Sequence, residues 1–433
     1  MNTNFTITCK TCEQDVDVRF GYSNRLIQPL TFACPHCESL LGITLSIEKA
    51  PESDFSFDGC EIIEERQTHK LFDGKNPFVD LHLDFPIWTK GYIPGLTPYM
   101  MAMQVLHASQ SEEKSHVLML STHGQRLSML NNLALEKDQI RIITKLYLGK
   151  NKQLFLKRVS DFFDQDVVGQ SLLPQDINAA LYLFLSFVFS PFLEEEIVRD
   201  FVFETNDILM GLMEKDKDSL DEMVNHFINT NYLSNLQKDC LELYVRVFDA
   251  EMPLRCALFV DLLDTESKDM TAAKVSVKDF FSYKDLYKDM AEVFGRQLIL
   301  VAAINNLIKR GDFNSFKIDH TGKSLSSLDK FADKTLSDKF KYLDDCWYEF
   351  EDDALNSDAR NAIAHYTAEY NPVTQIITYY PNKEGIKQEQ GVEMYFLEFM
   401  RMLLKLFRDV HYLHHVIKMM FYHKYLIIDK KDN

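Results

Sequence analysis

Four cysteines close to the N-terminus have the spacing of a metal site. Two residues separate Cys9 from Cys12 and Cys34 from Cys37. This spacing lets one tight turn present two thiolates to an ion, and two such turns complete a tetrahedral shell. We therefore predict one Zn²⁺ per chain, held by all four thiolates. The ion would be structural, because no position is left open for water.

Two questions about this module stay open. Rubredoxin-like iron is the minor alternative to zinc, since rubredoxin knuckles commonly carry glycine after the second cysteine, where this chain has Glu13 and Glu38. The module is too small to fold alone, so the metal would hold it together. Three cations belong to this module, namely Lys10, Arg19 and Arg25. They predict contact with either nucleic acid or protein.

A second group of reactive side chains lies far along the chain, at Arg360, Asn361 and His365. If Ser357 caps a helix, Arg360 and Asn361 fall in its first turn, where the N–H groups and the helix dipole favour a phosphate. Asn361 and His365 are four residues apart and share one face. The long arginine side chain can reach back, so the three groups would converge on one phosphodiester.

These groups can cleave RNA without a catalytic metal. The RNA 2′-hydroxyl attacks the adjacent phosphate, a histidine with a pKa near ~6.5 moves the proton, and an arginine stabilises the negative charge that develops. The products would be a 2′,3′-cyclic phosphate and a 5′-hydroxyl, and DNA would resist. The alternative is a capped helix in which Arg360 pairs with Asp358 or Asp353 and His365 is buried.

The stretch Arg360-Asn361-Ala-Ile-Ala-His365 resembles the signature of the HEPN ribonuclease superfamily, Arg-x4–6-His and often Arg-Asn-x3-His. The resemblance covers about residues 276–433. It implies a helical bundle, a homodimer in which two motifs line one cleft, and an RNA substrate, often tRNA. Many members are toxins or abortive-infection nucleases. A zinc ribbon ahead of such a domain is similar in architecture to anti-phage defence proteins of the ApeA type, which implies a phage-derived or cellular activator.

Hydrophobic periodicity predicts the elements that position these groups. Alternating residues predict a β zinc ribbon over 1–50, followed by a turn-rich linker at 50–59. Residues 51–275 form a mostly helical middle region, expected to be sensory or regulatory. Residues 276–433 are predicted to be a HEPN-like four-helix bundle with a β-hairpin before its last helix. The expected fold class is therefore mainly α with a small N-terminal β module.

The individual helices are expected at the following positions. Those of the middle region lie near 98–108, 124–135, 176–190, 194–214, 218–229 and 232–248, after an irregular stretch at 73–97. Those of the C-terminal region cover 277–310, 324–353, 358–370 and 392–427, and the hairpin strands cover 375–380 and 386–390.

The last predicted helix holds a rival for the catalytic pair. Arg408 and His414 fit a looser Arg-x5-His pattern, but no asparagine follows the arginine. His411 and His415 are spaced for a weak metal pair. The cations of this helix are Arg401, Lys405, Arg408, Lys418 and Lys424. They predict either a basic stripe that faces RNA or a solvated helix face.

Composition limits the function classes. The net charge of −18 argues against a protein that coats nucleic acid nonspecifically. No secretory signal precedes the first cysteines, and the apolar run at 177–193 predicts a buried helix rather than a membrane span. The remaining cysteines are scattered, which favours a reducing cytoplasmic setting. The main hypothesis is a metal-independent endoribonuclease. The alternative is a non-catalytic module that binds RNA or protein, and a membrane-associated or metal-dependent enzyme is weaker.

Overall fold

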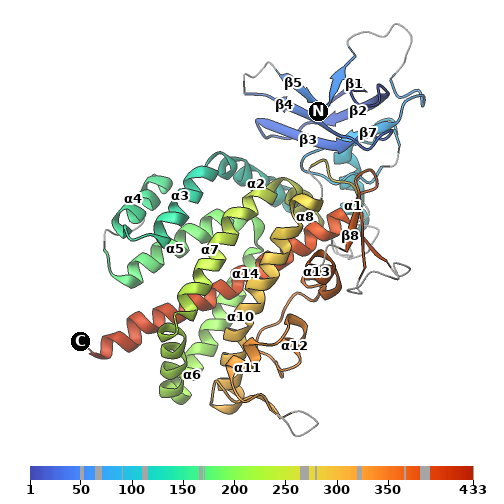
Figure 1. Cartoon of the computed structure of the whole chain (residues 1–433). Coiled ribbons are helices and arrows are strands. Elements are labelled where there is room, and N and C mark those ends of the chain that lie inside the picture. The colour runs from blue at the N-terminus through green and yellow to red at the C-terminus, as the bar shows by residue number, and fades with distance from the viewer. Residues whose placement is uncertain are drawn as a thin grey trace. The chain divides into compact units, whose positions relative to one another are not determined.

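The chain forms two compact units in a computed structural model (Figure 1). The structure describes residues 1–48, 53–63, 71–89, 91–109, 116–164, 169, 171–263, 273–277, 280–318, 324–364, 367–380 and 391–432. Unit 1 is built from Met1–Asn132, Asp249–Asp285 and Asp358–Leu404, and unit 2 from Leu133–Phe248, Leu286–Ser357 and Lys405–Asn433. Helices dominate the described residues, and a small β region forms at the N-terminus. The boundaries predicted at 50 and 275 stay predictions.

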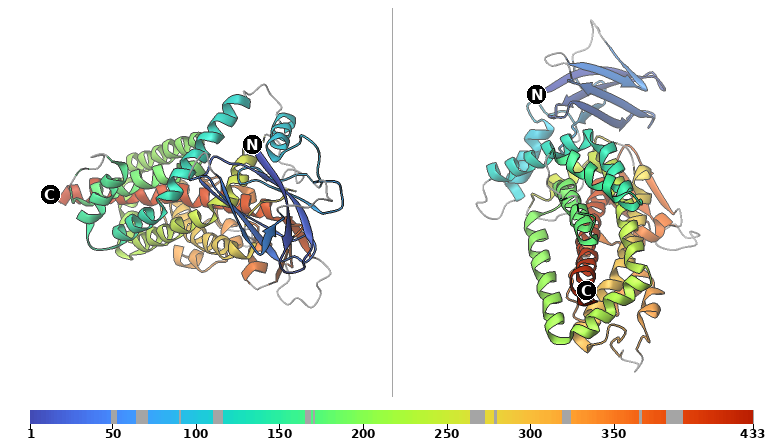
Figure 2. Two further views of the ribbon diagram at one scale, coloured as in Figure 1. Left: turned by 90° about the horizontal axis from the view of Figure 1, so that it is seen from above. Right: turned by 90° about the vertical axis from the view of Figure 1, so that its left-hand side faces the viewer.

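Two sheets form the N-terminal part of unit 1 (Figure 2). The first has the order β6–β1–β2–β7, with β6 at Cys60–Ile62, β1 at Asn2–Cys9, β2 at Asp15–Gly21 and β7 at Phe78–Leu81. The second has the order β3–β4–β5, with β3 at Ile27–Ala33, β4 at Leu40–Ser46 and β5 at Asp54–Asp58. All neighbouring strands are antiparallel except β2 and β7, which are parallel.

Aromatic side chains join the two sheets. Phe5 of β1 makes edge contacts with Phe55 and Phe57 of β5, at centroid distances of 5.5 and 5.8 Å. The linker predicted at 50–59 was therefore wrong for β5. Its Asp-Phe-Ser-Phe-Asp pattern alternates polar and apolar residues, as a half-buried strand does, and this alternation outweighs the turn-forming residues around it.

The remaining elements of unit 1 are short helices and one more sheet. The helices are α1 at Pro98–Ser109, α8 at Glu251–Val260, α13 at Ser357–Ala364, and the first parts of α2 at His116–Leu135 and α14 at Phe396–His423. The sheet has the order β10–β9–β8, with β8 at Ala368–Asn371, β9 at Ile376–Tyr379 and β10 at Val392–Tyr395.

Among the described residues of unit 2, all regular structure is helical. It contains α3 at Lys137–Leu148, α4 at Lys152–Phe163, α5 at Pro174–Phe189, α6 at Glu195–Asn229, α7 at Tyr232–Val247, most of α10 at Lys284–Arg310, α11 at Leu328–Ala332, α12 at Leu336–Phe340 and the rest of α14. In its core, Phe407 of α14 contacts Phe189, Phe192 and Tyr244.

The middle helices agree well with the periodicity. The helices expected near 98–108, 176–190 and 232–248 correspond to α1, α5 and α7. The break expected between 214 and 218 appears as a non-helical residue, Asp216, inside α6. The apolar run at 177–193 forms most of α5 as a largely buried helix. Among the described residues, α10 is the one helix long and apolar enough to cross a membrane, and 83% of its apolar window is buried inside the protein.

The C-terminal predictions were only partly right. The long helix expected at 324–353 was wrong, because Ser327 and Thr335 each cap a new five-residue helix, α11 and α12. The hairpin partner of β9 is β10, later than the predicted strand at 386–390, which lies outside the described residues. β8 replaces the end of the helix predicted at 358–370, and α14 begins at Phe396 rather than at residue 392.

Candidate functional sites

The four cysteines lie on two turns with the same hydrogen bonds. In the first turn, the Cys9 amide donates to the carbonyl of Gln14 and the Glu13 amide donates to that of Cys9. The second turn repeats both bonds among Cys34, Ser39 and Glu38. Glu13 and Glu38 have φ angles of 57° and 64°, in the left-handed region that favours glycine. Each turn ends a strand, so the sheets bring the two cysteine pairs together.

The geometry of the cysteine cluster fits a tetrahedral ion. All four sulfur atoms lie within 4.8 Å of one another, with Cys9 and Cys37 3.7 Å apart and Cys12 and Cys34 3.8 Å apart. A tetrahedral ion with sulfur ligands at about 2.3 Å places the sulfurs about 3.8 Å apart. The four predicted residues can therefore bind one metal ion such as zinc.

The environments of the thiols differ, which affects how easily each becomes the thiolate that a metal requires. Hydrogen bonds with the side chain and backbone of Ser39 lower the pKa of Cys37 to about 6. Burial raises the pKa of Cys34 to about 12. A bound cation would stabilise all four thiolates.

Two of the three cations near this module are engaged within unit 1. Arg19 is buried and forms an ion pair with Asp80, with 3.0 Å from its Nε to Oδ1. Arg25 donates to Glu251 at 2.6 Å. Lys10 is exposed. Carboxylates within the unit hold the guanidinium groups of Arg19 and Arg25, and contact of these cations with nucleic acid or protein stays a prediction.

The predicted motif begins near the start of helix α13. The helix starts at Ser357, so Arg360 falls in its first turn and Asn361 at the beginning of the second. Both side chains are half-buried, and Arg360 Nη1 lies 3.5 Å from Asn361 Oδ1. His365 lies outside the described residues, so the described part of the predicted catalytic group consists of Arg360 and Asn361. Asp353, one alternative partner of the arginine, is 3.3 Å from Lys405.

The rival pair on α14 belongs to the core of unit 2. Arg408 is 2% exposed and donates to the Phe192 carbonyl at 2.9 Å and to Glu194 at 2.7 Å. His414 is 1% exposed, and its Nδ1 lies 3.0 Å from the Tyr244 hydroxyl. Neither side chain can reach a phosphodiester in this conformation.

The basic stripe predicted on α14 does not form as expected. Lys405 contacts Glu351 and Asp353, and Lys424 contacts Asp429, at distances of 2.9 to 3.4 Å. Lys418 lies over the ring of Tyr182. Together with Arg408, these cations serve contacts inside unit 2. The pair His411 and His415 also gains no third ligand, since the cysteine cluster is the only metal-type group of three or more among the described residues.

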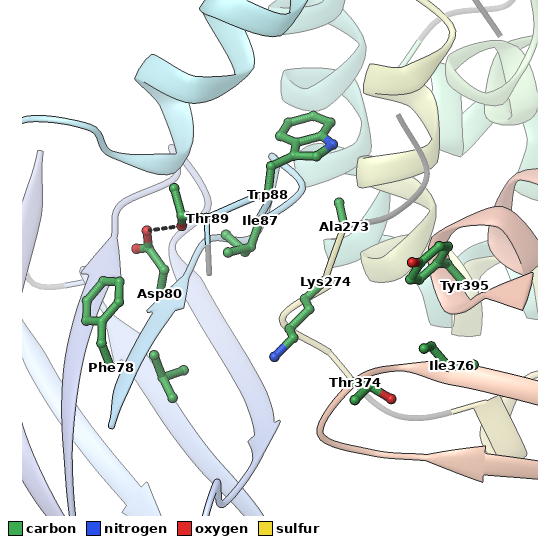
Figure 3. Close-up of a pocket in the computed structure, with 11 residues that line it drawn as sticks. Phe78, Asp80, Ile87, Trp88, Thr89, Ala273, Lys274, Thr374, Ile376 and Tyr395 are labelled. Carbon is green, nitrogen blue, oxygen red and sulfur yellow. Dashed lines mark hydrogen bonds between the residues drawn. The ribbon is translucent and has the colours of Figure 1, made fainter. Parts of the chain in front are cut away.

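Sequence patterns did not reveal a cavity of about 380 Å³ in unit 1 (Figure 3). Its walls come from three stretches that are distant in sequence, and the lining residues are Phe78, Val79, Asp80, Ile87, Trp88, Thr89, Ala273, Lys274, Thr374, Ile376 and Tyr395. No spacing within one stretch signals such a site. Only the tertiary fold brings its walls together.

Comparison with known family models, curated proteins and solved structures found no match to this chain. The resemblance to HEPN ribonucleases therefore rests on the residues of the motif at 360–365.

Proposed function

We propose that this protein is a HEPN-type endoribonuclease that works in the cytoplasm as a toxin or abortive-infection effector against phage, with tRNA among its candidate substrates. The observation that carries the proposal is that Arg360 and Asn361 lie close to the start of α13, with Arg360 Nη1 3.5 Å from Asn361 Oδ1. A guanidinium and an amide at a helix N-terminus provide several donors for one phosphate.

In the proposed reaction, the 2′-hydroxyl of the RNA loses its proton to His365 and attacks the neighbouring phosphorus. Arg360 stabilises the negative charge of the phosphorane, and Asn361 orients a phosphate oxygen. The bond to the 5′-oxygen of the next nucleotide then breaks, and that oxygen takes up a proton from water. The products are a 2′,3′-cyclic phosphate and a 5′-hydroxyl.

The cysteine cluster has a separate role in this proposal. A zinc ion held by Cys9, Cys12, Cys34 and Cys37 would stabilise the N-terminal strands and would have no position for substrate. The proposed active form is a homodimer in which two α13 motifs face one RNA. A phage-derived or cellular molecule would activate it.

The test uses the full-length protein with purified tRNA and total RNA. Reactions contain enough EDTA to remove free Mg²⁺, and the zinc content is measured afterwards. We expect cleavage to 5′-hydroxyl ends by the wild type and loss of cleavage in His365→Ala. The matched control is His107→Ala, since His107 is an exposed histidine of α1 in the same unit.

Growth of cells that express each variant is measured in parallel, because an effector awaiting its activator can be silent in vitro. Toxicity that is lost in His365→Ala and kept in His107→Ala supports the proposal. Equal cleavage by both variants, products with 5′-phosphates, or RNA binding without cleavage or toxicity would refute it. The last outcome would favour the non-catalytic RNA-binding alternative.

A further inference from the structure

The cavity of unit 1 has walls that hydrogen bonds hold together. Residues 85–89 and 273–277 meet at Ile87 and Lys274, whose backbone amides and carbonyls exchange two hydrogen bonds of 2.9 Å. The buried side-chain amide of Gln375 bonds to both the amide and the carbonyl of Val275, each at 2.8 Å. These bonds connect all three lining stretches, so the cavity exists before any ligand binds.

Lys274 brings a positive charge to the lining of the cavity. Among the described residues, the Lys274 amine has no ion pair and no hydrogen bond. The acid of the lining, Asp80, is held by the guanidinium of Arg19. Burial raises the pKa of Asp80 and the ion pair opposes that shift. In either protonation state, the Asp80–Arg19 pair adds no net negative charge, so Lys274 sets the charge of the cavity.

The rest of the lining is largely apolar and aromatic. Phe78, Trp88 and Tyr395 line the cavity together with Ile87 and Ile376. The lysine lies between the residues of β7 on one side and Thr374, Ile376 and Tyr395 on the other (Figure 3). Small-molecule sites commonly combine apolar walls with a few polar groups, in volumes of roughly 300–1,000 Å³.

We propose that this cavity binds a small aromatic molecule that carries a phosphate or carboxylate group. The anion contacts the Lys274 amine, and the ring lies against the aromatic side chains. The hydroxyl of Thr89, which bonds to Asp80 at 3.4 Å, and the hydroxyl of Thr374 are further polar groups of the lining. This binding site is separate from the RNA-cleavage proposal, and neither result decides the other.

The titration of the lysine agrees with this geometry. Burial lowers the pKa of Lys274, so the cavity makes its charged form less favourable than in water. A bound anion would reverse this effect and raise the pKa. Binding should therefore weaken as the pH rises through the pKa of Lys274.

Isothermal titration calorimetry on the full-length protein tests the site with five probes. Phenyl phosphate and benzoate represent simple aromatic anions, and adenosine monophosphate represents nucleotides. Phenol and inorganic phosphate each supply one half of the proposed ligand. We expect at least one aromatic anion to bind at least about tenfold more tightly than either half, since a charge-assisted contact and ring burial both contribute. Comparing the nucleotide with the simple anions identifies the source of the ligand.

Variants place the binding in the cavity. Lys274→Met keeps the length of the side chain and should weaken the best aromatic anion about tenfold or more, and Lys274→Arg should restore most of the loss. The matched control is Lys75→Met, because Lys75 is an exposed lysine of the same unit. Thr374→Trp should fill the cavity and weaken every probe that binds there.

Several results would overturn the proposal. They are equal binding of phenol and phenyl phosphate, equal binding of inorganic phosphate and phenyl phosphate, no binding by any aromatic anion, and unchanged affinity in both Lys274→Met and Thr374→Trp. Circular dichroism and melting of each variant confirm that it is folded, so that lost binding is not mistaken for unfolding.

Discussion

The two units use similar side chains in opposite ways. In unit 2, Arg408 and His414 are buried and bonded to groups of the unit's own core. In unit 1, Arg360 and Asn361 are half-buried at the start of a helix, four thiols gather in one cluster, and Lys274 faces a cavity. Unit 1 also buries ion pairs such as Arg19 with Asp80, but it keeps further reactive groups within reach of a ligand.

This contrast shows why residue spacing alone is a weak guide to chemistry. Arg408 with His414 and Arg360 with His365 have similar spacing. The first pair already has partners that a substrate would have to displace, at the cost of leaving a buried charge unpaired. The difference between the two units leads to five predictions.

Removing the metal should have the largest effect, and only in unit 1. In Cys9→Ser/Cys37→Ser, or after treatment with a strong chelator, we expect loss of most of the metal-binding free energy, on the order of 10 kcal/mol. Hydrogen exchange should then increase throughout β1–β5 and stay unchanged in α7. Cys346→Ser is the control, because Cys346 belongs to unit 2 and lies outside the cluster. Unchanged exchange in β1–β5 would show that these strands do not need the ion.

Arg408→Met should destabilise unit 2 by about 3–5 kcal/mol, since it leaves the Phe192 carbonyl and Glu194 without their partner. Arg360→Met should lower the free energy of unfolding by less than about 1 kcal/mol, because the Arg360 side chain is only half-buried. Urea unfolding measures both. A third variant, Arg141→Met, removes an exposed ion pair of unit 2 and should resemble Arg360→Met. Similar losses for Arg408 and Arg360 would remove the contrast between the units.

Arg360→Lys should separate activity from stability. Lysine keeps the charge but loses the planar fork of donors, so we expect RNA cleavage to fall by about 10²–10³-fold with the folded state intact. Cleavage rates measured beside melting curves provide the test. If activity survives in the lysine variant, bidentate phosphate contact by Arg360 is not part of the reaction.

The histidines of α14 should make unit 2 sensitive to acid. Burial lowers the pKa of His411 to about 4, below its usual value near 6.5. The unfolded chain therefore binds the proton first, and the stabilising contribution, complete above pH 6.5, decreases as the pH falls toward 4. The difference in unfolding free energy between wild type and His411→Asn should shrink by roughly 3 kcal/mol over this range.

Burial acts in the opposite direction on Asp409, whose pKa rises to about 7. This carboxyl is present in both wild type and His411→Asn. Its contribution therefore cancels from the difference between their unfolding free energies. A difference that is constant with pH would mean that His411 is hydrated in the folded protein.

Replacing the left-handed glutamate in each of the two cysteine turns by glycine should have the smallest effect. Glu13→Gly and Glu38→Gly place a residue without a Cβ at left-handed positions, and each should stabilise the metal-bound protein by about 0.5–1 kcal/mol. Thermal melting with bound zinc measures the gain. Glu48→Gly, at an exposed residue not among those with positive φ, should not stabilise the protein. Stabilisation of the same size in that variant would mean that relief of left-handed strain is not the cause.

Local patterns explain which features could be predicted. The cysteine spacing identified all four residues of the cluster, because each knuckle is one turn of consecutive residues. Strong periodicity identified α1, α5 and α7, and the polar stretch near Asp216 identified the break in α6. The helix start expected near Ser357 was close, since α13 begins at Ser357.

The sequence by itself therefore determined the ligands of the proposed metal, most long helices and the order of groups in the Arg-Asn-x3-His motif, because each depends on neighbours within a few residues. Only the tertiary structure decided that Arg19 and Arg408 are buried in ion pairs and that Lys274 faces a cavity. Burial and pairing depend on residues far away in the chain. Asp80 lies in a different strand from Arg19, 61 residues later in the sequence. Glu194 precedes Arg408 by 214 residues. No local pattern encodes such partners.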